Sequence, residues 1–236
     1  MKGWGLALAL LSAGAGTAAA QGPSTEGQFW PALVVRHQLA SPLSAQLYSQ
    51  LKSGVDYDYD QLGLGVRLGY QAGAIRKEHL IGIDPDAEHA LVLGTGYEYL
   101  DTRQASGDKY ENRLVADGTF RNRPAKTWLL ADRNRFEFRW VDGVYSTRYR
   151  NRLTVQADLT AGDVHLSPYA SAEFFYDWAK DSWNEEQYAL GVLWQARRRA
   201  SVALYYLYQD CSTCSPQYVN ALGVTLTLYT GVEHRR

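Results

Sequence analysis

The sequence predicts an all-β protein, namely an antiparallel up-and-down transmembrane β-barrel of about twelve strands (10–12) that follows an N-terminal signal peptide. Three observations predict this fold class. The first residues form an export signal, the rest of the chain alternates between apolar and polar residues without helical periodicity, and aromatic residues gather near the ends of the apolar faces. The 236-residue chain contains 17 tyrosines and 7 tryptophans, a composition that suits strands and interfacial aromatic belts.

Residues 1–20 have the three parts of a secretory signal peptide. Lys2 supplies the positive charge, residues 6–11 form an apolar run, and three alanines at 18–20 provide a small-residue cleavage site. The apolar run is too short to span a bilayer as a helix. We therefore expect export through the Sec pathway and a single barrel domain at residues 21–236.

The alternation is clearest in QLGLGVRLGYQ at residues 61–71, where leucine, valine and tyrosine face one way and glycine, arginine and glutamine face the other. Later segments repeat this pattern: YASAEFFYDW at 169–178, QYALGVLWQA at 187–196, SVALYYLYQ at 201–209 and NALGVTLTLYT at 220–230. Weaker segments lie near residues 28–38, 43–53 and 74–83. The whole set makes about twelve strands at roughly 18 residues for each strand and its turn, which suits tilted strands of about 10 residues.

Residues 133–156 form a predicted hairpin that carries six arginines on alternate positions. Asp142 and Gly143 mark its two-residue turn. The spacing across this turn places all six on one face, and they are Arg133, Arg135, Arg139, Arg148, Arg150 and Arg152. That face is either the solvated exterior of a soluble lipocalin-like barrel or the interior of a membrane barrel.

Three features favour the membrane barrel. Arginine dominates the polar face and has carboxylates beside it for bidentate pairing. The final segment also approximates the C-terminal signature of barrels that the bacterial outer-membrane machinery inserts. Aromatic residues with apolar-face parity predict a girdle of Trp140, Tyr145, Trp178, Tyr188, Trp194, Tyr206 and Tyr208. We expect the interior to be lined by Arg133, Arg135, Glu137, Arg139, Arg148, Arg150, Arg152, Asp158, Glu173 and Asp177.

Five stretches of the chain resemble a known family: RNRFEFRW, YRNRLTVQ, PYASAEFFYDW, NEEQYALGVLWQ and VALYYLYQDC. The resemblance is to the bacterial outer-membrane family known as domain of unknown function 2490, and it is clearest from about residue 110 onward. In this family an arginine-bearing pair of strands precedes a Pro-x-x-S-x-E-x-F strand, which corresponds here to Pro168, Glu173 and Phe175. The resemblance implies an outer-membrane barrel and brings no established reaction.

Cys211 and Cys214, in DCSTCSP, predict a short loop disulfide in an exported protein. A redox CxxC motif is the alternative, but the sequence has no βαβ unit to hold one. Two cysteines do not complete a four-ligand zinc site, and the DYDYDQLG stretch lacks the glycine and glutamate of a calcium loop. We therefore expect no metal and no cofactor.

The near-neutral charge gives no basic signature for nucleic acid. We expect a bacterial outer-membrane protein whose partners are membrane lipid, lipopolysaccharide and, during biogenesis, the barrel-assembly machinery. Two roles fit this expectation. One is a narrow channel for small polar solutes, in which the six arginines set a mild anion preference, and the other is a structural envelope protein whose interior is plugged.

Two further functions are alternatives. An outer-membrane lipid-modifying hydrolase on the same scaffold would use His165 and Ser167, but strand neighbours two positions apart are about 7 Å apart, too far for a direct hydrogen bond. We therefore expect that the protein is not an enzyme. The other alternative is a soluble periplasmic barrel that binds an apolar ligand and is extracted without detergent.

Overall fold

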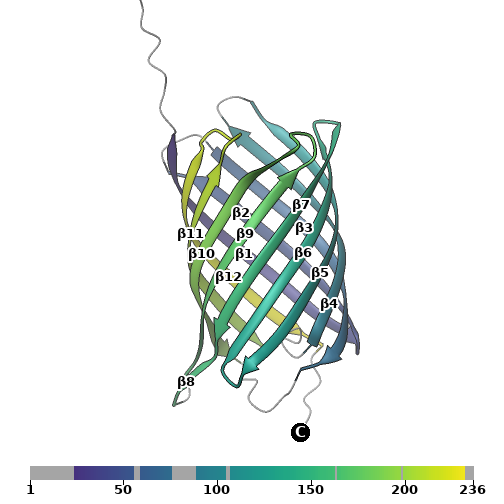
Figure 1. Cartoon of the computed structure of the whole chain (residues 1–236), viewed down its shortest axis with the longest axis vertical. Helices are drawn as coiled ribbons and strands as arrows, with labels where there is room; N and C mark the ends of the chain where they lie inside the picture. The colour runs from purple at the N-terminus through teal and green to yellow at the C-terminus, as the bar shows by residue number, and fades with distance from the viewer. Residues whose placement is uncertain are drawn as a thin grey trace, which may run out of the picture.

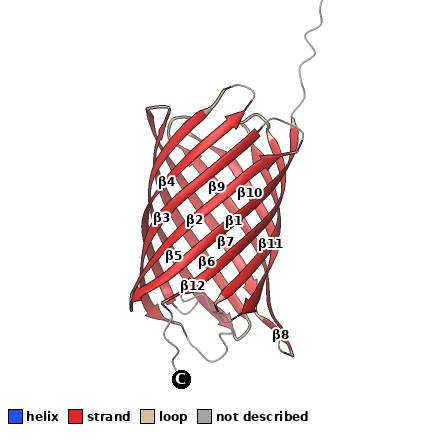
Figure 2. Ribbon diagram, turned by 180° about the vertical axis from the view of Figure 1, so that it is seen from behind, coloured by secondary structure: helices blue, strands red, loops and turns tan. Residues whose placement is uncertain are grey.

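The computed structural model describes residues 24–55, 59–75, 89–104, 107–162, 164–197 and 199–231, and every regular element among them is a β-strand (Figures 1 and 2). The expected signal peptide and most of the weak segment at 74–83 lie outside the described residues. Within the described part, no helix is long and apolar enough to cross a membrane. The strands are β1 (Thr25–Ala40), β2 (Leu43–Gly54), β3 (Tyr59–Ala74), β4 (His89–Gln104), β5 (Lys109–Ala125), β6 (Trp128–Val141), β7 (Val144–Ala157), β8 (Leu159–Ala161), β9 (Val164–Asp177), β10 (Ser182–Arg197), β11 (Ala200–Cys211) and β12 (Tyr218–Thr230).

The strands close into a barrel, which confirms the predicted all-β fold class. Each wall strand pairs with the next in antiparallel fashion, and the sheet closes where β12 pairs with β1 in parallel, from Thr25 opposite Tyr218 to His37 opposite Thr230. The short strand β8 continues β7 in the same register, since Gln156 faces Tyr169 and Leu159 faces Leu166. The wall therefore has eleven strands plus one extension, close to the expected twelve, and one of its pairs is parallel.

An odd number of wall strands places the two ends of the sheet at opposite ends of the barrel. Figure 1 shows β1 beginning at one end and β12 finishing at the other. We call the end where β1 begins, and where the connection at 212–217 lies, the disulfide end. The opposite end, where β8 lies, is the β8 end. The predicted turn at Asp142 and Gly143 is present at the disulfide end, with the two positive φ angles of 48° and 83° that a tight hairpin requires.

The outer face of the barrel is largely apolar, with a polar group of Asp132, Asn134 and Asn151 on β6 and β7. Large apolar side chains such as Leu47, Leu190 and Leu222 are 57%, 66% and 62% exposed. Polar residues at the alternate positions are buried, including Glu137 and Glu173. Because side chains of a strand alternate between its two faces, the polar residues point into the barrel and the apolar residues point outward. This arrangement is the reverse of that in a water-soluble barrel.

Inward glycines create room for inward tyrosines on the neighbouring strand. Gly191 lies opposite Tyr169, and a Cβ at this glycine would come within 2.7 Å of the tyrosine ring. The pairs Gly65 with Tyr48 and Gly223 with Tyr205 have the same arrangement. Each ring lies over a glycine backbone, which keeps the ring against the wall and shields the glycine.

The interior has two walls of different chemistry. The apolar wall is formed by β1, β11 and β12, where Trp30, Leu207, Val219 and Ala221 form a buried cluster. The opposite wall, formed by β4 to β7 and β9, carries most of the buried charges of the described residues. Between the two walls the Lys52 ammonium lies 4.0 Å from the centre of the Trp30 ring.

Candidate functional site in the barrel interior

The charged wall consists of arginines and carboxylates on adjacent strands, which we call the arginine ladder. Three pairs of arginines lie directly opposite each other across neighbouring strands: Arg113 with Arg139, Arg135 with Arg150 and Arg133 with Arg152. Like charges in such positions repel each other. Carboxylates lie between the guanidinium groups and offset this repulsion. Its members are Glu98, Glu111, Arg113, Asp117, Arg133, Arg135, Glu137, Arg139, Arg148, Arg150, Arg152, Glu173 and Asp177.

Glu137 is the central carboxylate of the ladder and is 0% exposed. Its Oε2 accepts a hydrogen bond from Arg148 Nε at 2.8 Å, and its Oε1 accepts one from Arg150 Nη1 at 2.7 Å. Arg113 and Arg135 each place an Nη1 atom 4.0 Å from Oε1. Four guanidinium groups therefore surround one buried carboxylate.

Glu173, on β9, is the second shared carboxylate, and it is 1% exposed. Its Oε1 accepts hydrogen bonds from Arg133 Nη2 at 2.6 Å and from Arg150 Nε at 3.0 Å. Its Oε2 accepts one from Arg152 Nε at 2.9 Å. Since Arg150 contacts both Glu137 and Glu173, it links the two carboxylates into one network.

Three carboxylates from β4 and β5 extend the ladder beyond the predicted hairpin. Glu111 accepts hydrogen bonds from both Arg113 and Arg139, with Nη2 to Oε2 distances of 3.0 and 3.1 Å. Glu98 accepts one from Arg135 at 3.2 Å. Asp117 forms an ion pair with Arg67 and lies 3.6 Å from Arg135. The alternation of β5 in the sequence marks Glu111 and Asp117 as interior residues. The contact of Glu98 on β4 with Arg135 on β6 arises only because the closed wall brings these two strands near each other.

Phe175 is an interior residue that the sequence analysis did not place in the site. It is 1% exposed, and its ring centre lies 5.1 Å from the Arg148 guanidinium and 4.5 Å from that of Arg150. An aromatic face stabilises cations at this range. Its position two residues after Glu173 was the available signal, because residues two apart on a strand share a face.

Two of the predicted interior carboxylates occupy different positions from Glu137 and Glu173. Asp177 lies 3.8 Å from Arg139, at the disulfide end of the ladder. Asp158, between β7 and β8, is paired with Arg123 at 2.9 Å and not with an arginine of the predicted hairpin. Asp158 thus belongs to a separate group of charges at the β8 end.

The described residues line two cavities in the interior. The larger, about 1180 Å³, opens toward the disulfide end and is lined by both the arginine ladder and the apolar wall. The smaller, about 270 Å³, lies at the β8 end. Arg133 and Arg152 line both cavities, so these two side chains mark the place where the cavities meet. The Arg152 side chain is 36% exposed, more than the other ladder arginines.

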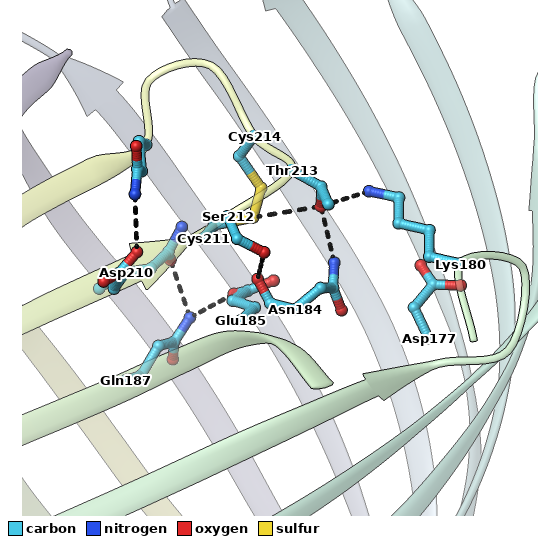
Figure 3. The surroundings of a disulfide bond; sticks show 12 residues. Asp177, Lys180, Asn184, Glu185, Gln187, Asp210, Cys211, Ser212, Thr213 and Cys214 are labelled. Atoms are coloured by element: carbon cyan, nitrogen blue, oxygen red, sulfur yellow. Dashed lines mark hydrogen bonds between the residues drawn. A yellow bond between two sulfur atoms is a disulfide. The ribbon is translucent and has the colours of Figure 1, made fainter. Parts of the chain in front are cut away.

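Cys211 and Cys214 form a disulfide at the rim of the larger cavity (Figure 3). The Thr213 hydroxyl between them accepts hydrogen bonds from Lys180 and, at 2.8 Å, from the Asn184 amide. These contacts connect the 212–217 segment to the β9–β10 turn. Glu185 lies within 4.8 Å of both sulfur atoms, but disulfide sulfurs are not thiolates, so this group is a poor metal site.

The predicted girdle aromatics are spread along the barrel, with four of the seven at the disulfide end. Trp140, Tyr145, Trp178 and Tyr208 lie at or near the disulfide end, Tyr188 and Tyr206 lie near the middle of β10 and β11, and Trp194, opposite Leu166, lies near the β8 end. Trp140 and Tyr145 pack with ring centres 5.2 Å apart. Trp178 stacks on Phe136 at 6.2 Å.

The His165 and Ser167 side chains both face the smaller cavity. Ser167 donates its hydroxyl hydrogen to Asp158 at 2.8 Å, and His165 Nδ1 lies 3.4 Å from the Thr160 hydroxyl. Within the described part of the chain no hydrogen bond joins His165 to Ser167. Nucleophilic catalysis requires a base within hydrogen-bonding reach of the hydroxyl, and this pair does not provide one.

No curated protein matches the chain. A family model described as "Protein of unknown function (DUF2490)" matches residues 27–220, a range that includes the arginine ladder, most residues that line the two cavities, nine complete wall strands and parts of β1 and β12. The match covers most of the chain and agrees with the resemblance in the arginine-bearing strands and the Glu173–Phe175 strand. The chain therefore belongs to the DUF2490 family.

Proposed function

We propose that this protein is an integral barrel of the bacterial outer membrane, exported by a signal peptide at residues 1–20, and that it acts as a narrow channel for small polar solutes. The observation that carries the membrane location is the predominantly apolar exterior of the wall strands, on which Asn151 donates hydrogen bonds to Asp132 and Asn134 in a polar group on the outward faces of β6 and β7. Apolar patches of this extent are unfavourable in water and are suited to lipid. In this location the partners are membrane lipid and lipopolysaccharide, with the barrel-assembly machinery during biogenesis.

The interior supports the same location. Its arginines and carboxylates are mutually paired, so their charges are compensated within the barrel and none of the ladder is required to face lipid. The odd number of wall strands is unusual for a bacterial single-chain barrel, in which the number is generally even. For this reason the location needs a direct test.

The location is tested by fractionation and by electrophoretic mobility in SDS, with unboiled and boiled samples compared. A faster unboiled band confined to the outer-membrane fraction supports a closed, detergent-resistant barrel. Release with the periplasm and no heat-dependent shift would reject the membrane location in favour of a soluble periplasmic barrel.

The channel role is supported by the two cavities that meet at Arg133 and Arg152. A solute that passes from one cavity to the other would pass these two cations, so anions should pass more readily than cations of the same size. Planar-bilayer conductance of the purified protein tests this role. We expect small, anion-preferring conductance that falls in Arg152→Gln, because Arg152 is the most exposed ladder arginine. A protein that folds in the membrane but does not conduct would instead be a structural envelope protein.

A further inference from the structure

The smaller cavity, at the β8 end, is lined by more arginines than carboxylates. Arginines from five different strands line it: Arg36 from β1, Arg67 from β3, Arg121 and Arg123 from β5, Arg133 from β6 and Arg152 from β7. Asp158 is the one carboxylate among the described residues that line it. Asp117 and Glu173, which do not line the cavity, pair with Arg67 and with Arg133 and Arg152, whereas the charge of Arg121 in this space of about 270 Å³ lacks a described carboxylate partner.

The nearby carboxylates are already bonded to other groups. Asp158 accepts hydrogen bonds from Arg123 Nη1 at 2.9 Å, Gln156 Nε2 at 3.0 Å and the Ser167 hydroxyl at 2.8 Å. Glu173 is shared among Arg133, Arg150 and Arg152. Neither carboxylate forms an ion pair with Arg121, so the Arg121 guanidinium has no carboxylate partner among the described residues.

Guanidinium nitrogens at this cavity provide a second, independent observation. Arg121 Nη1, Arg123 Nε and Arg133 Nε are buried and have no hydrogen-bond partner among the described residues. The Arg123 side chain is only 8% exposed, and Arg121 forms no ion pair with any described residue. Buried charged donors are costly unless an acceptor is bound to them. The donors therefore point to an anionic ligand.

We propose that the smaller cavity is a binding site for a small tetrahedral oxyanion of the phosphate class. Guanidinium groups that come from several strands approach the cavity from different directions. A tetrahedral anion offers acceptor oxygens in several directions, whereas a planar carboxylate is fully bound by one bidentate guanidinium. A cavity of about 270 Å³ suits a small anion with some of its hydration water. This site shares Arg133 and Arg152 with the arginine ladder, whereas Arg121 and Arg123 lie outside the ladder, and the proposal does not depend on the membrane location.

Arg121 is the residue best suited to a test, because removing its charge leaves no described carboxylate without a partner. The purified full-length protein is titrated with inorganic phosphate by isothermal titration calorimetry at constant ionic strength. We expect Arg121→Gln to weaken binding by about tenfold or more, the loss typical of one charge-assisted contact. The matched control is Arg103→Gln, which removes the same charge from an exposed position on β4 and should bind as the wild type does.

A second variant gives an independent outcome. Ala131 lies opposite Arg121 in the β5–β6 pair and lines the same cavity, so Ala131→Asp would introduce a competing carboxylate beside Arg121 and abolish phosphate binding. Far-UV circular dichroism verifies that each variant is folded.

Titration with glycerol 3-phosphate in parallel distinguishes free phosphate from the phosphate group of a larger solute, since tighter binding of the ester would identify the larger solute as the ligand. The proposal is overturned if the wild type binds neither ligand, or if all folded variants bind phosphate equally. Failure of the membrane proposal would appear in the fractionation and not in this titration.

Discussion

Substitution of Glu137 by glutamine tests whether the arginine ladder stabilises the barrel. Its two oxygens accept hydrogen bonds from Arg148 at 2.8 Å and Arg150 at 2.7 Å, and Arg113 and Arg135 lie 4.0 Å away. Glutamine has nearly the same shape, but it carries no charge and presents an amide donor to a guanidinium donor. Because the side chain is fully buried, we expect the free energy of unfolding to fall by about 3–5 kcal/mol, the range for breaking a buried ion pair.

The assay is urea unfolding of the folded barrel, monitored by tryptophan fluorescence. Asp108→Asn is the matched control, since it makes the same change of charge at an exposed site between β4 and β5. The double variant Glu137→Gln/Arg148→Gln should recover part of the loss, because one of the uncompensated cations is removed as well. If Glu137→Gln differs from Asp108→Asn by less than about 0.5 kcal/mol, the ladder does not hold the wall together and the reasoning is wrong.

Three further changes have expected outcomes. Gly223→Val should displace the Tyr205 ring into the larger cavity and lower the free energy of unfolding by about 1–3 kcal/mol. Gly63→Ala is the control, because its Cβ would meet only a carbonyl oxygen at 3.8 Å, and it should have little effect. Equal effects of the two changes in urea unfolding would contradict the glycine–tyrosine packing. Removing the disulfide with Cys211→Ser and Cys214→Ser should lower the free energy of unfolding by about 2 kcal/mol or less, because the closed loop is short. A larger loss in the same assay would mean that the disulfide stabilises more of the barrel than its own loop. Epitope tags at the two ends of the mature chain should be accessible from opposite sides of the membrane, so labelling of both tags on intact cells would reject the parallel closure.

The sequence by itself determined the faces of the strands and the character of each face. Side chains alternate with a period of two in any strand, so the run from Leu62 to Tyr70 could be assigned to one face before its neighbours were known, and its apolar members are exposed in the structure. The turn at Asp142 and Gly143 was equally predictable, because few residues other than glycine, asparagine and aspartate adopt two successive positive φ angles. These properties depend on residues close together in the chain.

Only the tertiary structure decided how the barrel closes and which charges meet inside it. The parallel contact of β1 with β12 joins residues such as His37 and Thr230, which are 193 positions apart and hydrogen-bonded at 2.9 Å. The pairing of Glu98 with Arg135 and the gathering of Arg36 with Arg121 at the smaller cavity likewise depend on strands brought together by the curvature of the wall. Alternation specifies which face a residue occupies but not the number of strands, their register or the residue across the interior, because these are set by the closure of the whole sheet.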